Sequence, residues 1–207
     1  MISNWEFRIS NLGVLIAFGA WFCLAAPALA STALEQTRET LEKARAIAGS
    51  ERTHDEKLAD LSKLLRSFLD TDTMGRAALD KHWSSFSQAQ QREFLTLFRE
   101  LFQRTYVQKL LLFEKPDFEY VGEEPAGENV NVLTKIVTPR DDFAVTYRLH
   151  RVGQSWQATD IQIEDLSLTA NFRRQLDRLI TKSSVENVLD RMRRKYGSAA
   201  RGEDEGL

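Results

Sequence analysis

The stretch Asn129–His150, NVNVLTKIVTPRDDFAVTYRLH, decides the fold class of this chain. Apolar and polar side chains alternate on both sides of a short turn at 139–142, and a period of two predicts β-strands. A turn of this length joins strands that lie side by side and run in opposite directions. The stretch therefore predicts an antiparallel hairpin.

Further strands are expected on both sides of this hairpin. Residues 156–164 follow a turn at Gly153 and continue the alternation. Residues 118–121 come before the turn at 125–127 and predict an edge strand. The expected sheet has about four to five antiparallel strands.

Apolar residues recur at helical spacing before and after the strand region. The pattern predicts helices over about 34–48, 58–69, 74–83, 88–113, 168–180 and 185–192. The helix over 88–113 opens with a capping box at Ser87 and Gln90, and its apolar arc of roughly 160° is wider than that of an ordinary surface helix. The predicted fold class is α+β, with N- and C-terminal helices packed on an antiparallel sheet.

The first thirty residues resemble a secretory signal peptide. An apolar run over 12–24 ends in the A-x-A pattern of Ala28 and Ala30, which predicts cleavage before Ser31. The uncharged stretch 12–30 also approaches the length of a membrane span, so an uncleaved anchor is the alternative. Cleavage would leave a single domain over 31–197 and a polar tail over 198–207 that is expected to be disordered.

Composition argues against several functional classes. A formal net charge of −2 does not suggest a nucleic-acid partner. The only cysteine, Cys23, lies in the leader, so the exported chain is expected to lack disulfides and thiol nucleophiles. The histidines at 54, 82 and 150 have no partner at metal-ligand spacing, and no phosphate loop or nucleophile elbow occurs. These observations favour a protein that is not an enzyme and has no cofactor or metal.

Two charged groups have alternative interpretations. Asp160, Glu164 and Asp165 end an apolar strand and are the best candidates for acid–base chemistry. Their position before a helix favours a structural corner in which acidic residues complement the helix N-terminus. The basic run 191–195 could contact anionic headgroups or a partner, although cations in a last helical turn also complement the helix dipole.

The expected helices and strands carry a surplus of apolar residues. Val132 and Leu133 place apolar side chains on both faces of one strand. A fully packed core accounts for this surplus, and so does a core that keeps a cavity for an apolar ligand. Composition leaves both interpretations open.

Three groups of residues carry a resemblance that bears on this choice. They are LDKHW at 79–83, QAQQREF at 88–94 with LFRELFQRTY at 97–106, and WQATDIQIEDLSL at 156–168 with NFR at 171–173. In this order and at these separations they resemble the MlaC-type family of periplasmic phospholipid carriers, also called toluene-tolerance auxiliary proteins. The likeness covers about 58–193 and departs at Asp80 and Asp165, where the family usually has glycine.

The resemblance implies a non-enzymatic carrier in the periplasm that holds a phospholipid as cargo in an apolar cavity. Its implied partners are an inner-membrane ABC lipid transporter complex and an outer-membrane lipoprotein–porin complex. Moving lipid between them would maintain the lipid asymmetry of the outer membrane. A carrier of hopanoids or other apolar lipids, and a non-enzymatic assembly factor with a solid core, are the alternatives.

Under this interpretation, residues on the apolar faces of the expected elements should line the lipid cavity. They are Phe98, Leu101, Tyr106, Val132, Tyr147, Leu168 and Phe172. Three arginines interrupt or border apolar stripes and are expected to contact a partner: Arg104, Arg173 and Arg174.

Overall fold

The computed structural model describes residues 31–111 and 117–200. Its sheet has five strands in the order β1-β2-β3-β4-β5, and each strand is antiparallel to the next. The strands are β1 (Asp117–Ala126), β2 (Asn129–Val137), β3 (Asp142–Val152), β4 (Ser155–Ile163) and β5 (Leu166–Ser167). The expected antiparallel sheet of about four to five strands is confirmed.

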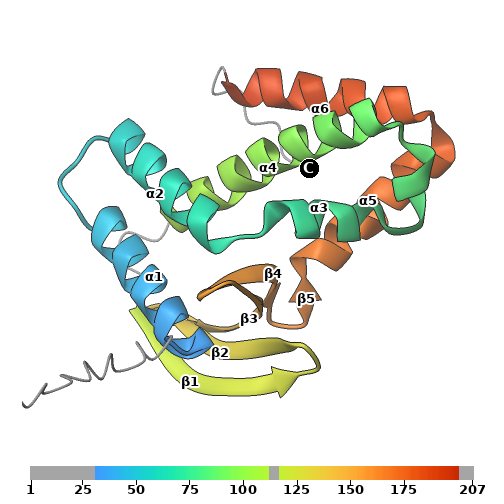
Figure 1. Cartoon of the computed structure of the whole chain (residues 1–207). Coiled ribbons are helices and arrows are strands. Elements are labelled where there is room, and N and C mark those ends of the chain that lie inside the picture. Colours follow the sequence, from blue (N-terminus) through green and yellow to red (C-terminus); the bar gives the residue numbers. More distant parts are fainter. Residues whose placement is uncertain (1–30, 112–116, 201–207) are drawn as a thin grey trace, which may run out of the picture.

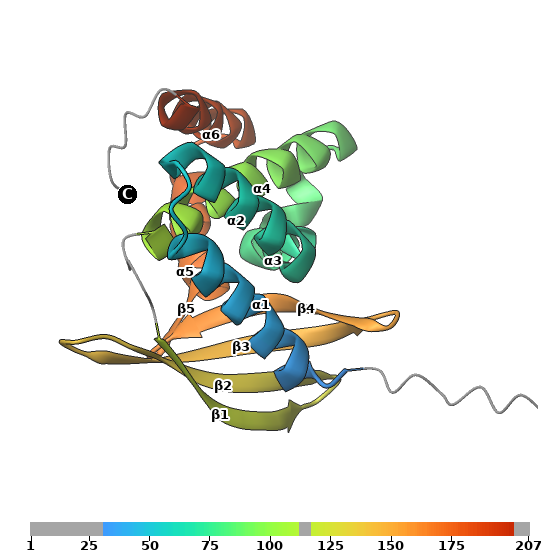
Figure 2. The ribbon, with the colours of Figure 1, turned by 90° about the vertical axis from the view of Figure 1, so that its left-hand side faces the viewer.

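Four α-helices come before the sheet in the chain and two follow it. They are α1 (Ala33–Ala48), α2 (His54–Phe68), α3 (Thr71–Leu79), α4 (Gln88–Leu111), α5 (Leu168–Lys182) and α6 (Val185–Ala200), with a short 3-10 helix η1 (Asp80–Ser85). Figures 1 and 2 show the helices gathered over one face of the sheet, with α1 lying across the strands. The expected α+β class is thus confirmed.

The strand alternation explains which face the helices cover. Val145, Tyr147 and Leu149 on β3 are buried, whereas the intervening Arg148 is exposed. In a pleated strand alternate side chains point to opposite faces, so the buried set defines the face beneath the helices. Phe94 on α4 and Leu61 on α2 are fully buried in the same core.

Polar contacts hold α1 to the sheet at several points. The α1 backbone begins with a capping box between Thr32 and Glu35. The Leu34 backbone N–H donates to Glu123 Oε2 at 2.7 Å, and the Gln36 side chain bonds both backbone groups of Trp156, at 2.5 and 2.8 Å. These contacts attach α1 to β1 and β4.

The structure differs from the sequence-based prediction at several element boundaries. The helix expected over 74–83 ends at Leu79, because Asp80 has φ +48° and ψ −121°, a conformation that an α-helix cannot continue. Strand β1 extends to Ala126 and pairs with all of β2, with a bulge between Tyr120 and Gly122. Helix α6 reaches Ala200, so the first residues of the tail expected to be disordered are helical.

The expected signal peptide at 1–30 and the rest of that tail, 201–207, lie outside the described residues. Within 31–111 and 117–200, no helix combines the length and apolar character needed to cross a bilayer.

Candidate functional site

An apolar cavity of about 410 Å³ lies between the sheet and helices α1, α2 and α4. This volume falls within the range of small-molecule binding sites, about 300–1,000 Å³. The lining residues are Thr40, Leu41, Ala44, Leu65, Phe68, Leu69, Phe102, Tyr106, Ile136, Phe143, Val145, Tyr147, Ile161, Ile163 and Leu168. The wall is therefore almost entirely hydrocarbon.

Helix and strand periodicity position these side chains. On α1, Leu41 and Ala44 are three residues apart and share one side of the helix. On β3, Val145 and Tyr147 alternate with polar residues and point to the same face as Ile161 on β4. Each element thus contributes one apolar face, and the cavity is the volume that these faces leave unfilled.

Tyr147 supplies a polar group within this wall. The residue is 6% exposed, and its hydroxyl makes no hydrogen bond within the described part of the chain. Burial raises the pKa of the Tyr147 hydroxyl far above its ordinary value, so the group stays neutral at physiological pH. Thr40 differs, because its hydroxyl donates to the Gln36 carbonyl at 2.8 Å. Tyr147 can therefore offer a hydrogen bond to a ligand in the cavity.

Three of the residues expected to line a lipid cavity lie on its wall. They are Tyr106 from α4, Tyr147 from β3 and Leu168 at the start of α5. Helix spacing and strand alternation thus bring together residues from three separate parts of the chain.

The other four expected residues do not lie on the cavity wall. Phe98 contacts Phe172 edge to face, with ring centroids 5.3 Å apart, in an aromatic cluster between α4 and α5. Val132 is fully buried in the core, and Leu101 is half-buried on α4. These four residues belong to the same apolar stripes as residues of the wall. Their own side chains, however, do not face the cavity.

The α1 and α2 contributions to the wall were missed by sequence reasoning. Leu41 and Ala44 stand in a weak helical pattern, and Leu65 and Phe68 stand in a strong one. Their spacing shows that each helix has an apolar side. On β3, Phe143, Val145 and Tyr147 follow one another at intervals of two residues, which places all three on the same face of the strand. This spacing could have identified Phe143 and Val145 as wall residues from the sequence.

Two of the three carboxylates considered for acid–base chemistry, Asp160 and Glu164, have structural partners. Asp160 Oδ1 accepts from the backbone N–H of Ile161 and of Thr169, at 2.9 and 3.0 Å, and its Oδ2 accepts from the Ser167 hydroxyl at 2.6 Å. Glu164 Oε1 accepts from the Ala144 backbone N–H at 2.7 Å. This arrangement fits the strand-to-helix corner that was the alternative interpretation.

Two of the three histidines, His82 and His150, lie next to a carboxylate. His82 Nε2 lies 2.8 Å from Asp177 Oδ1, and His150 Nε2 lies 3.1 Å from Asp70 Oδ2, although that second contact lacks hydrogen-bond geometry. Among the described residues, no three His, Cys, Asp or Glu side chains are grouped to hold a metal ion.

The three arginines expected to contact a partner lie on two different helices. Arg104 on α4 lines a polar groove beside α2. Arg173 on α5 donates from Nε to the Ala77 carbonyl at 2.9 Å and lies 3.9 Å from Asp80 Oδ2. Arg174 Nη2 lies 3.5 Å from Asn171 Oδ1 and is exposed. Arg173 and Arg174 form an exposed pair on α5, and Arg104 belongs to another surface.

The fold and cavity define a class of protein in which helices and an antiparallel sheet enclose an apolar site. The MlaC protein family matches residues 33–194, and the chain belongs to that family. The resemblance drawn from the sequence is thereby confirmed.

A solved structure shares the fold. It is a phospholipid-binding protein from Ralstonia solanacearum in complex with a phospholipid, 20% identical in sequence, with a TM-score of 0.72 over 82% of this chain and 99% of that chain. No curated protein sequence shows a significant match to this chain.

Proposed function

We propose that this protein carries a phospholipid, whose acyl portion occupies the apolar cavity. The observation that carries the proposal is the hydrocarbon wall around about 410 Å³ of unfilled volume in an otherwise buried core. Membership of the MlaC family and the phospholipid bound to the Ralstonia protein of the same fold support it. In this proposal Tyr106, Tyr147 and Leu168 contact the cargo directly.

The cavity volume sets how much lipid fits in this conformation. If a methylene group takes about as much space as a water molecule in the liquid, ~30 Å³, the cavity accommodates about 14 such groups. That is one acyl chain.

The burial energy explains why such a protein would need a partner. Transfer of one chain of this length from water contributes about 11 kcal/mol at ~0.8 kcal/mol per CH₂. Spontaneous release into water is then very slow, and transfer requires contact with an acceptor that offers an apolar path. No catalytic step is part of this proposal.

The finer proposal concerns place and partners. The protein would act in the periplasm, after export by the leader at 1–30, and move phospholipid between an inner-membrane ABC transporter complex and an outer-membrane lipoprotein–porin complex. The family resemblance supports these partners. Arg104, Arg173 and Arg174 are the proposed contacts with them, because guanidinium groups at a surface suit acidic side chains or phosphates.

Mass spectrometry of lipids extracted from the purified, exported protein tests the core proposal. We expect near-stoichiometric, chemically intact phospholipid. A predominance of hopanoid would favour the alternative cargo, and an absence of lipid would favour an assembly factor. Transfer of labelled phospholipid to vesicles, with and without the partner complexes, tests the finer proposal, and equally fast transfer to bare vesicles contradicts it.

Phe98, Leu101, Val132 and Phe172 remain predicted lipid contacts, although they lie off the wall described above. Leu101→Glu tests this, because the side chain is half-buried and tolerates a charge better than a core position. A folded Leu101→Glu protein that still retains lipid removes Leu101 from the set.

A further inference from the structure

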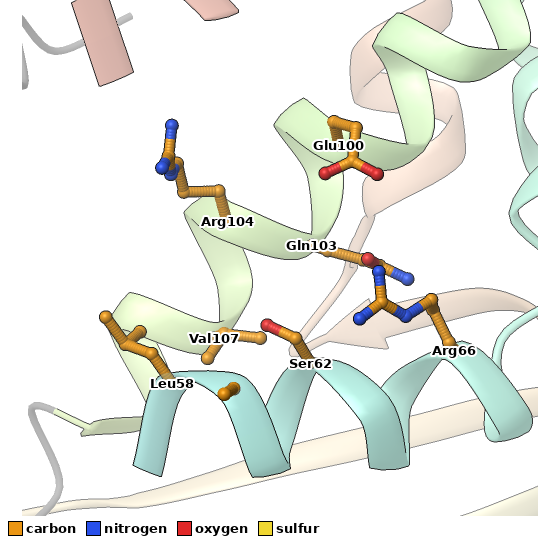
Figure 3. Close-up of a pocket in the computed structure, with 8 residues that line it drawn as sticks. Leu58, Ser62, Arg66, Glu100, Gln103, Arg104 and Val107 are labelled. Carbon is orange, nitrogen blue, oxygen red and sulfur yellow. The ribbon is translucent and has the colours of Figure 1, made fainter. Parts of the chain in front are cut away.

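A polar groove between α2 and α4 is separate from the apolar cavity and shares no lining residue with it. Its volume is about 300 Å³, and Figure 3 shows its walls. Arg66 and Gln103 directly follow the cavity residues Leu65 and Phe102 in the chain. Successive side chains of a helix point in directions about 100° apart. The side chains of Arg66 and Gln103 therefore lie on a different side of α2 and α4 from Leu65 and Phe102.

Gln103 gives the clearest sign that the groove binds something. Its side chain is 2% exposed, and Nε2 makes no hydrogen bond within the described part of the chain. Buried polar groups in proteins nearly always have a partner, because a buried donor has lost its water without replacement. The Gln103 amide therefore requires an acceptor that the described residues do not supply.

Two arginines share the groove and lack a carboxylate partner among the described residues. They are Arg66 and Arg104, and Arg104 Nη1 is buried without a hydrogen bond. On the same helix α4, Arg99 differs, because its Nη2 is paired with Asp72 Oδ1 at 2.6 Å. Figure 3 shows the Arg66 guanidinium beside Gln103, and Arg104 extending from α4 away from α2 at the rim of the groove.

The remaining polar groups define the ligand's charge and shape. Glu100 is the one carboxylate among the residues that line the groove, so the two arginines leave an excess of one positive charge. The Ser62 hydroxyl adds a further donor. A guanidinium fork, an amide NH₂ and a hydroxyl together match the several oxygens of one phosphate group.

We propose that this groove is a phosphate-binding site, separate from the lipid cavity. Its ligand is either free inorganic phosphate or the phosphodiester of a lipid headgroup. The proposal does not rest on lipid carriage, because none of its residues lines the cavity.

Thermal unfolding and calorimetric titration of the purified, exported protein test the site. We expect inorganic phosphate to raise Tm above its value in chloride of equal ionic strength. Arg66→Met and Gln103→Leu should each weaken phosphate binding by about tenfold or more. Lys63→Ala is the matched control, because Lys63 is exposed on α2 and does not line the groove.

Phosphate also stabilises proteins without binding, by exclusion from their surface. An equal rise in Tm for the wild type and all three variants, with no saturable binding, would therefore overturn the proposal. If Gln103→Leu does not fold, Arg66→Met decides alone, because Arg66 is exposed.

Two probes distinguish the source of the phosphate. Tighter binding of glycerophosphoglycerol, the deacylated headgroup of phosphatidylglycerol, assigns the site to a headgroup, and tighter binding of inorganic phosphate assigns it to the free ion. Failure of both to bind overturns the proposal. Lipid content is measured in the same samples, and lipid missing from the wild type contradicts the carrier function alone.

Discussion

The ring of Phe68 on α2 meets the ring of Tyr147 on β3 edge to face, with centroids 5.8 Å apart and an interplanar angle of 63°. Both rings line the apolar cavity, so the contact joins a helix of the N-terminal half to the sheet at the wall of the site. Such aromatic pairs contribute about 0.5–1.5 kcal/mol beyond simple burial. The pair therefore holds the Tyr147 hydroxyl in a defined position inside the cavity.

Tyr147→Phe tests whether that hydroxyl contacts cargo. We expect the free energy of unfolding of the lipid-free protein to stay the same or to rise by up to about 1 kcal/mol, because the deletion removes a buried hydroxyl that has no hydrogen-bond partner among the described residues. Retention of a labelled diacyl phospholipid should weaken about 2- to 10-fold, the effect of losing one neutral hydrogen bond to an ester carbonyl. Unchanged lipid retention would mean that the hydroxyl does not touch the cargo.

Ala44→Phe tests the cavity as the lipid site. Ala44 is buried on the wall, so a phenyl ring there would occupy volume that the acyl chain needs. We expect the bound lipid per protein, measured by mass spectrometry, to fall by at least about half, while the lipid-free protein is as stable as the wild type because part of a void is filled.

Ala46→Phe is the matched control, since Ala46 is exposed on the same helix. A loss of lipid in both variants would point to an effect on α1 rather than on the cavity.

Asp80→Gly tests the strained junction between α3 and η1. Asp80 adopts φ +48° with ψ −121°, a region where a side chain is unfavourable and glycine is not. We expect the free energy of unfolding to rise by about 1 kcal/mol, which exceeds the small loss from the exposed Arg173 contact. Chemical denaturation measures the change.

Asp165→Gly gives the comparison. The family usually has glycine at both positions, but the positive φ at that turn belongs to Glu164 and not to Asp165. We therefore expect no gain in stability from Asp165→Gly. A gain of similar size in both variants would show that backbone strain is not the cause.

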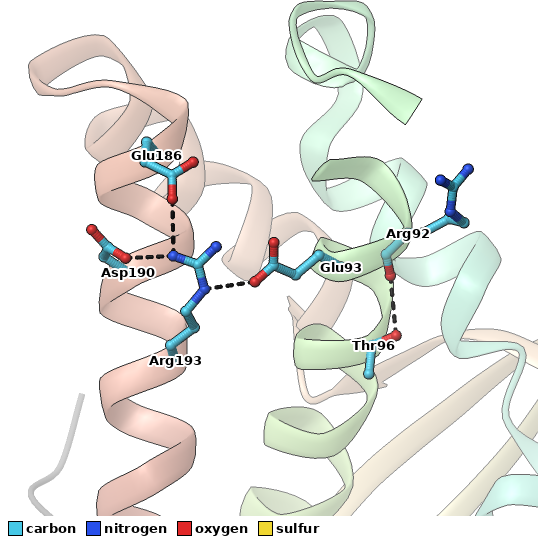
Figure 4. Close-up of polar contacts among 6 residues, drawn as sticks. All are labelled: Arg92, Glu93, Thr96, Glu186, Asp190 and Arg193. Carbon is cyan, nitrogen blue, oxygen red and sulfur yellow. Dashed lines mark hydrogen bonds and ion pairs between the residues drawn. The ribbon is translucent and has the colours of Figure 1, made fainter. Parts of the chain in front are cut away.

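Arg193→Met tests the attachment of α6 to α4. Figure 4 shows Arg193 on α6 between Glu93 of α4 and the acidic Glu186 and Asp190 of its own helix, and its Nε lies 2.6 Å from Glu93 Oε1. Because the partners are partly exposed, we expect Tm at pH 7 to fall by no more than about 4 °C. Arg194→Met, an exposed neighbour, should leave Tm unchanged.

The Arg193–Glu93 pair also predicts how the difference in Tm between Arg193→Met and the wild type depends on pH. The hydrogen bond from Arg193 lowers the pKa of Glu93 below its ordinary value of 4.5. A carboxylate with a lowered folded-state pKa stabilises the fold above its unfolded pKa and loses that contribution as pH falls through the folded value. The Tm gap between Arg193→Met and the wild type should be full above about pH 5 and shrink as pH falls below 4.5. A gap that is constant down to pH 3 would mean that packing, not charge, causes it.

Local chemistry in the sequence was sufficient for the elements and the class of fold. The alternation in 129–150 predicts a hairpin because strand side chains have a period of two, and Ser87 with Gln90 predicts the start of α4 through a capping box. The segment WQATDIQIEDLSL at 156–168 also indicated the family. These are short-range properties, so they could be predicted before the tertiary structure was known.

The cavity, in contrast, was decided by the tertiary structure. Phe98 and Phe102 lie one helical turn apart on the same stripe of α4, yet only Phe102 lines the cavity, while Phe98 packs against Phe172. Leu41 lines the same cavity as strand residues such as Val145, which is about 100 positions away in the chain. Spacing along the sequence determines which side of an element is apolar. Which other element that side meets, and whether the two fill the space between them, depends on helix positions that only long-range packing decides.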